Sequence, residues 1–205
     1  MKRLIIFVAI LTTTLSVMAQ HEEGDFTVQP KLGLSIATLS DADKSIADFH
    51  LGMEVEYMFT DKFSLGFGAI LSNQGAKYDK TDEAPKYEVD LDYVQVPVLA
   101  SYYVLPGLAV KVGIQPGFKM RAKYKGDDGT VDLDQLYGLY NKTMDNNLKV
   151  STVDVSIPVG ISYEYKNIVL DARYNWGLKK VLNQGDAFYN RWFMISLGYK
   201  FNVGL

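Results

Sequence analysis

The chain contains 205 residues, of which 48% are hydrophobic and 13% aromatic, with 21 basic and 24 acidic side chains and no cysteine. This length suits a single domain, and the acidic balance argues against a nucleic-acid partner. The absence of cysteine excludes disulfide bonds, thiolate nucleophiles and thiolate metal sites.

The first residues have the pattern of an export signal. Lys2 and Arg3 precede an apolar run over Leu4–Leu11, and small residues end at Ala19, after which we expect cleavage. The apolar run is shorter than the roughly 20 residues that a membrane-spanning helix requires, so insertion into a membrane would require a closed β-barrel. The expected division is a signal peptide over 1–19 and one mature domain over 20–205.

From Phe26 onward, apolar and polar residues alternate with a period of two, which is typical of strands with one apolar and one polar face. We predict eight such strands: Phe26–Thr38, Phe49–Phe59, Phe63–Ser72, Asp92–Val104, Leu108–Arg121, Val150–Tyr165, Ile168–Trp176 and Phe193–Phe201.

Three of the connections are tight turns, around Asp61, Pro106 and Lys166–Asn167. Residues that lie opposite each other in a hairpin share a face, so the turns fix the register. The predicted opposite pairs are Glu56 with Gly66, Gln95 with Gly117, and Ser162 with Asp171.

Short turns alternate with long connections, and aromatic residues such as Tyr57, Phe59 and Phe63 gather beside the short turns. Both features indicate an eight-stranded antiparallel up-and-down transmembrane β-barrel with short periplasmic turns and long extracellular loops. Periodicity alone does not distinguish inside from outside. A soluble sandwich and a lipocalin-like exported barrel with its apolar faces turned inward therefore stay open as alternatives.

Three stretches, Tyr93–Tyr103, Asp171–Leu178 and Ile195–Phe201, resemble the PorT-like outer membrane protein β-barrel family, whose members are small porin-like barrels of Gram-negative envelopes. The resemblance implies a location in the outer membrane, contact with its lipids, and assembly by the barrel-assembly machinery. Family members commonly end on the aromatic residue of the last strand. Here Asn202–Leu205 follow Phe201, so the residue that acts as the assembly signal stays open.

The polar faces of the predicted strands would line the lumen, which in an eight-stranded barrel is just wide enough to be filled by side chains. Buried charges are tolerated when they are paired, so we expect a plug of ion pairs. The alternative is a narrow porin-like conduit for small solutes. The charged residues predicted to face the lumen are Lys31, Glu54, Glu56, Lys111, Lys119, Arg121, Asp154, Glu164, Asp171, Arg173 and Lys200.

No catalytic, cofactor or metal site is predicted. His50 is the one histidine within a predicted strand, and no recognisable serine and acid accompany it. An outer-membrane hydrolase that uses His50 as a base is the remaining enzymatic alternative. The acids of Asp127–Asp134 do not have the spacing of a calcium-binding loop, so we interpret them as solvated loop residues.

The longest connection contains apolar residues at helical spacing, which predict a short amphipathic helix after Asp132. We interpret it as a helix across the barrel mouth; alternatively, its exposed side chains bind an envelope protein or a surface ligand. A structural or surface-binding role at the cell envelope is therefore expected. The residues of this possible binding surface are Leu133, Leu136, Tyr137, Tyr140 and Met144.

Overall fold

The computed structural model describes residues 22–39, 44–78, 87–126, 129–144, 151–180 and 189–203, so the expected signal peptide over 1–19 lies outside the described residues. The elements are β1 (Phe26–Leu39), β2 (Lys44–Thr60), β3 (Phe63–Tyr78), β4 (Tyr87–Gln95), β5 (Val98–Leu105), β6 (Leu108–Gly126), β7 (Gly129–Asp132), α2 (Leu133–Met144), β8 (Val153–Tyr165), β9 (Ile168–Lys180), β10 (Tyr189–Tyr199) and β11 (Phe201–Asn202).

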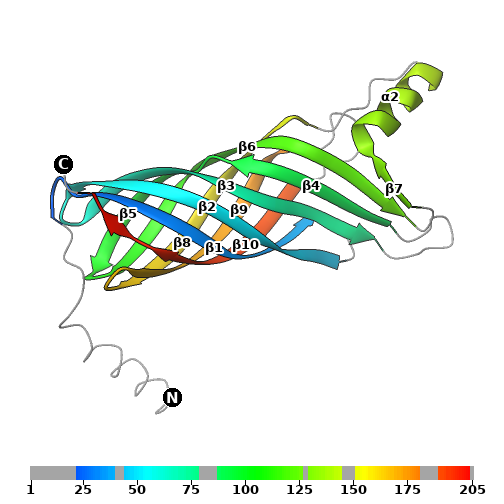
Figure 1. Cartoon of the computed structure of the whole chain (residues 1–205). Helices are drawn as coiled ribbons and strands as arrows, with labels where there is room; N and C mark the ends of the chain where they lie inside the picture. The colour runs from blue at the N-terminus through cyan, green and yellow to red at the C-terminus, as the bar shows by residue number, and fades with distance from the viewer. Residues whose placement is uncertain are drawn as a thin grey trace, which may run out of the picture.

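The strands form a closed antiparallel barrel, which confirms the predicted eight-stranded architecture (Figure 1). Pairing of β1 with β10, for example Leu32 opposite Leu197, closes the sheet. β4 and β5 are two halves of one barrel strand. They separate at Pro97, which has no N–H to donate to the ladder. β10 and β11 are likewise consecutive parts of the last strand.

The three short turns lie at one end of the barrel, called here the turn end, and the opposite end is called the loop end (Figure 1). Lys166 adopts a positive φ of 55° in its turn, and Asn167 Nδ2 donates to the Lys200 carbonyl at 2.8 Å. All three predicted pairs are confirmed: Glu56 with Gly66, Gln95 with Gly117, and Ser162 with Asp171.

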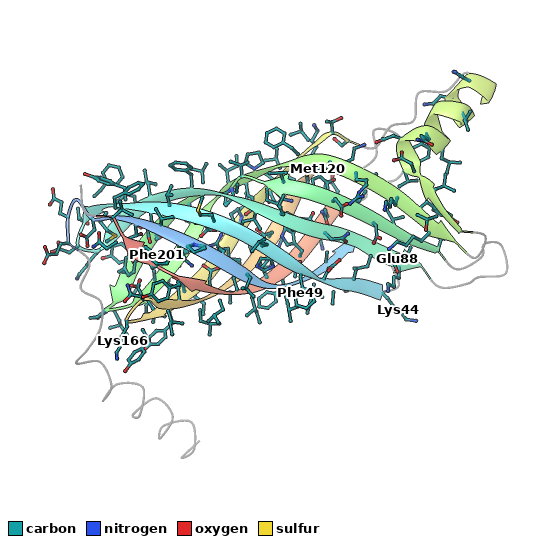
Figure 2. All side chains as sticks on the ribbon, in the orientation of Figure 1. Lys44, Phe49, Glu88, Met120, Lys166 and Phe201 are labelled. Carbon is teal, nitrogen blue, oxygen red and sulfur yellow. The ribbon has the colours of Figure 1, made fainter. Side chains whose placement is uncertain are left out.

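The two faces of the barrel have opposite polarity. Large apolar side chains cover the outside, where Phe49 is 74% and Met120 67% exposed, and Figure 2 shows both on the outer surface. Charged side chains such as Arg173 and Lys31 are buried inside. A lipocalin-like barrel requires its apolar faces inside, so this arrangement excludes that alternative. Among the described residues, no helix has the length and apolarity needed to cross a membrane.

At the loop end, β3, β4 and β6 continue beyond their predicted limits, and the polarity of their faces reverses. The outer face of β4 there carries Glu88, Asp90 and Asp92, while Leu91 points inward and is fully buried. Val94 lies two residues nearer the turn end than Asp92, and the outer face there is still apolar. The apolar outer belt therefore ends between Val94 and Asp92, and a loop-end extension with a charged outer face begins.

A β-bulge in β6 makes this extension possible. Asp92 lies opposite Arg121 while Tyr93 lies opposite Lys119, so Met120 is an extra residue in β6. A bulge of one residue changes the face on which every later side chain lies. Arg121 therefore points outward and is 58% exposed, and the prediction that it faces the lumen is wrong.

The helix predicted after Asp132 is present as α2. The Asp132 carboxylate caps it by accepting the N–H groups of Asp134 at 2.9 Å and Gln135 at 3.1 Å. Leu133 is buried against β4 and β6 in a cluster that includes Leu91. α2 contacts β6 and β7 and extends away from the barrel (Figure 1), so the interpretation that it lies across the mouth is wrong.

Deletion of single residues tests the role of the bulge. Without Met120, Lys119 and Arg121 follow one another opposite Tyr93 and Asp92, so every later side chain keeps its face and the extension is expected to resist added protease as in the wild type. Without Ala122, either Arg121 or Lys123 takes its place opposite Leu91, and the charge is buried in the apolar cluster without a partner at a cost of several kcal/mol. We therefore expect the loop-end extension of this second variant to be cleaved much faster, while the barrel stays intact. Equal protease resistance of the two deletion variants would contradict this account.

Candidate functional site

The lumen contains a central layer of ionised side chains built around Arg173 of β9. Its guanidinium binds Glu54 of β2 through two parallel hydrogen bonds, Nη1 to Oε1 at 2.6 Å and Nη2 to Oε2 at 2.7 Å. Nη2 also donates to Asp171 at 2.8 Å, and Nε lies 2.8 Å from the same carboxylate as an ion pair without hydrogen-bond alignment. Such two-pronged contacts fix both position and orientation.

Two lysines complete the central layer from other strands. Lys31 Nζ of β1 lies 3.2 Å from Glu54 and 3.5 Å from Asp171. Lys111 Nζ of β6 lies 3.3 Å from the other oxygen of Asp171. Four strands distributed around the barrel are therefore connected across its interior.

A second charged layer lies nearer the turn end. Lys200 Nζ is 2.8 Å from Glu56 and 2.8 Å from Glu164, and it donates to the Tyr103 hydroxyl at 3.0 Å. Tyr103 in turn donates to Glu56 at 3.1 Å, and the Ser64 hydroxyl donates to the same carboxylate. Every ionised group of this layer therefore has a partner of opposite charge.

Together the two layers contain four bases and four acids, all buried, so their formal charges cancel. Neutrality matters because an unpaired charge in the interior would cost several kcal/mol. Between the layers, a space of about 10 Å³ lined by residues that include Gln29, Glu56 and Lys111 is large enough for about one water molecule. At this level the lumen is filled.

Glycines make room for these long side chains. A Cβ at Gly160 would lie 2.7 Å from Arg173 Cγ, and one at Gly68 would lie 2.6 Å from Glu54 Cγ. Both contacts are closer than real Cβ atoms allow. Gly68 and Gly160 thus leave the space that the side chains of Glu54 and Arg173 occupy. The alternating pattern alone did not reveal this role.

Toward the loop end, the charged layers are followed by apolar and neutral polar side chains. Ala37, Ile70, Trp192 and Met194 form a buried cluster. Five buried amides, each at 0% exposure, also lie inside the barrel. The sequence placed three of them on polar faces without indicating a role. The five amides are Gln74, Gln95, Gln115, Asn175 and Asn190.

Eight of the eleven predicted lumen charges therefore meet in one cluster, and three do not. Lys119 binds Asp134 of α2 at 2.6 Å. Arg121 lies on the outer face, where its Nε donates to Asp92 at 2.7 Å. Asp154 is buried, accepts the Val155 N–H at 2.8 Å, and forms no ion pair within the described part of the chain.

His50 lies inside the lumen. Its Nε2 is 2.8 Å from Ser196 Oγ, and both residues are buried. Within the described ranges, Nδ1 has no hydrogen-bond partner, so no carboxylate orients the ring as a catalytic base requires. The same residues contain no group of three or more His, Asp or Glu side chains that could hold a metal ion.

The predicted helix surface is divided by the structure. Leu133 is buried and Tyr137 is half-buried against the extension, whereas Leu136 is 39% exposed. Leu139, three residues further on, is 67% exposed and was missed, although its spacing from Leu136 was a usable signal. The side chains of Tyr140 and Met144 lie outside the described residues.

Outside the apolar belt, ion pairs cross the outer face of the loop-end extension. Glu88 binds Lys77 at 2.9 Å and Lys125 at 3.2 Å, and Lys125 also pairs with Asp90. Burial raises the pKa of Glu88, but the hydrogen bonds from the two lysines outweigh this and hold the pKa below its usual range. The hydrogen bond to Asp90 raises the pKa of Lys125.

Two solved structures share the fold of this chain. Ail, the attachment invasion locus protein of Yersinia pestis, aligns with a TM-score of 0.53 and 15% identity over 87% of this chain and 99% of its own. Neisserial surface protein A aligns with a TM-score of 0.55 and 18% identity over 87% of this chain and 100% of its own. At these identities the likeness shows the fold alone.

The search of curated proteins gives no match. A family model described as an outer membrane protein β-barrel domain matches residues 18–183, which is most of the chain. Together with the apolar outer belt and the closed eight-stranded barrel, this match establishes the location as the outer membrane. The chain belongs to the outer membrane protein β-barrel domain family.

Proposed function

We propose that this outer-membrane barrel is a closed anchor that presents its loop-end extension outside the cell. The observation that carries the proposal is the filled lumen, in which four bases and four acids pair and leave space for about one water molecule. A porin needs a continuous polar path, and this cluster interrupts it. The role is therefore structural or surface-binding.

The proposed orientation places the turn end in the periplasm. Outer-membrane barrels have short periplasmic turns and longer external loops, and the three short turns of this chain share one end. We propose that the signal peptide is cleaved after Ala19 and that the barrel-assembly machinery inserts the mature chain. Membership of the PorT-like branch is part of the same proposal and rests on the three sequence stretches quoted above.

The surface that meets a partner is proposed to be α2 and the strand edge beside it. Leu136 and Leu139 of α2 and Val131 of β7 are exposed apolar side chains. α2 extends away from the barrel (Figure 1). Exposed apolar residues beyond a membrane belt suit an envelope protein partner. Ail has been solved in complex with the heparin analogue sucrose octasulfate, which is an example of a ligand on a barrel of this fold.

Single-channel recording in planar bilayers tests the closed lumen. We expect the inserted wild type to show no resolvable conductance, because the paired side chains fill the section at Arg173. The double variant Glu54→Ala and Arg173→Ala removes one acid and one base, keeps the cluster neutral and opens space, so we expect it to conduct.

The control for this recording is the double variant Asp92→Ala and Arg121→Ala, which removes an equivalent ion pair from the outer face. It is expected to stay silent. Insertion is verified for each protein by the shift in gel mobility on heating. A steady conductance of the wild type that changes with charge substitutions in the lumen would establish the narrow channel instead.

A further inference from the structure

One buried acid of the lumen has no base beside it. Asp154 of β8 is buried on the inner face, on the loop-end side of the two charged layers, whose own charges cancel. Among the described residues, Lys179 is the base whose charge acts on Asp154, but Lys179 is exposed and forms no ion pair with it. Lys119 of the neighbouring strand β6 binds Asp134 instead. One negative charge in this part of the lumen is therefore left without a partner, which is costly in a protein interior.

Three buried side chains here each have one oxygen without a hydrogen bond within the described ranges. These atoms are Asp154 Oδ2, Gln115 Oε1 and Asn190 Oδ1. The other polar atom of each group already has a partner. Asp154 Oδ1 accepts the N–H of the next residue at 2.8 Å, and Gln115 Nε2 donates to Gln95 at 3.5 Å. Asn190 Nδ2 donates to Gln74. The three atoms left free are therefore all acceptors.

The three side chains lie around Ser156 of β8. Gln115 is directly opposite Ser156 on β6, and Asp154 is two residues nearer the loop end on the same face. On its other side Ser156 is opposite Gly177 of β9, and Asn190 of β10 lies beside Gly177. Because Gly177 has no side chain, Asn190 reaches across it, and its amide lies next to the Asp154 carboxylate. The free oxygens of three strands therefore face the same part of the lumen.

A cation suits these oxygens better than a water molecule alone. A water molecule has two hydrogens, so it leaves one of the three oxygens unpaired and the charge of Asp154 uncompensated. Hard cations prefer carboxylate and amide oxygens as ligands. One monovalent cation neutralises a single carboxylate, whereas a divalent cation would leave a buried positive charge. The Gln95 amide lies over Gly117, which is opposite Asp154, and its free Nε2 suits a water molecule bound to the cation.

We propose that Asp154, Gln115 and Asn190 bind one sodium ion in the lumen, on the loop-end side of the charged layers. The Asp154 carboxylate neutralises the ion, the two amide oxygens complete the protein ligands, and water fills the remaining positions. The site is separate from the charged layers and from the surface of α2, so it stands whatever the loop-end extension binds.

Heat-induced unfolding of the full-length protein in detergent tests the site, with sodium as the probe. Sodium chloride is exchanged for the chloride of N-methylglucamine, whose cation is too large for the site, at constant ionic strength and pH. Sodium binds the folded barrel, so we expect saturating sodium to raise the midpoint temperature by roughly 5 °C. Asp154→Asn removes the charge, and its midpoint is expected to be the same in both salts. Gln115→Met removes one ligand and is expected to need about tenfold more sodium for half of the effect.

Asp48→Asn is the matched control. Asp48 Oδ1 also accepts the N–H of the following residue, at 2.7 Å, but Asp48 lies on β2 and is only half-buried. This variant is expected to keep the wild-type response to sodium. Equal midpoints of the wild type in both salts, or a wild-type response in Asp154→Asn, would overturn the proposal. So would a larger shift with calcium at the same ionic strength, since it would require a divalent site. If Asp154→Asn does not fold, an unchanged sodium response in Gln115→Met overturns the proposal by itself.

Discussion

Pairing of buried charge is the constraint on which this barrel depends. The apolar faces must point outward to lipid, so the polar faces point into a lumen too narrow for bulk water. Four bases and four acids there form a neutral cluster around the two-pronged contact of Arg173 with Glu54. Gly68 and Gly160 allow these side chains to cross the interior. The same interactions that stabilise the barrel also fill it, which links stability directly to the proposed closure of the lumen.

The outer face divides the molecule into a membrane belt and the loop-end extension. Polarity reverses between Val94 and Asp92 on β4, and the bulge at Met120 reverses β6 at the same level. Below this boundary the inside is charged or polar, apart from the apolar cluster that includes Ile70. Above it the inside is apolar and packs against Leu133 of α2. The extension is thus built like a small soluble sheet continuous with a membrane barrel, which suits the partner-binding surface proposed for it.

Much of the barrel was predictable because alternation has a fixed period and tight turns fix register. The eight strands, the three hairpin registers and the helix after Asp132 all follow from these local rules. The prediction for Arg121 was wrong because one extra residue in β6 changes the face on which every later side chain lies. Alternation within β6 cannot reveal this extra residue, because it is defined only by the pairing of β6 with β4. The continuation of β4 was missed because Glu88, Asp90 and Asp92 reverse the expected polarity, although they still alternate with apolar residues. Which acid pairs with which base was not predictable, because the pairing depends on distances across the lumen between side chains of different strands.

A double-mutant cycle on Glu54 and Arg173 tests the central claim most directly, through the free energy of unfolding in detergent. The account predicts that Glu54→Gln and Arg173→Met alone each cost about 3–5 kcal/mol, since each leaves a buried charge without its main partner. The double variant, which stays neutral, should cost clearly less than the two single changes added together. Additive costs would show that the two charges act independently and would contradict the account.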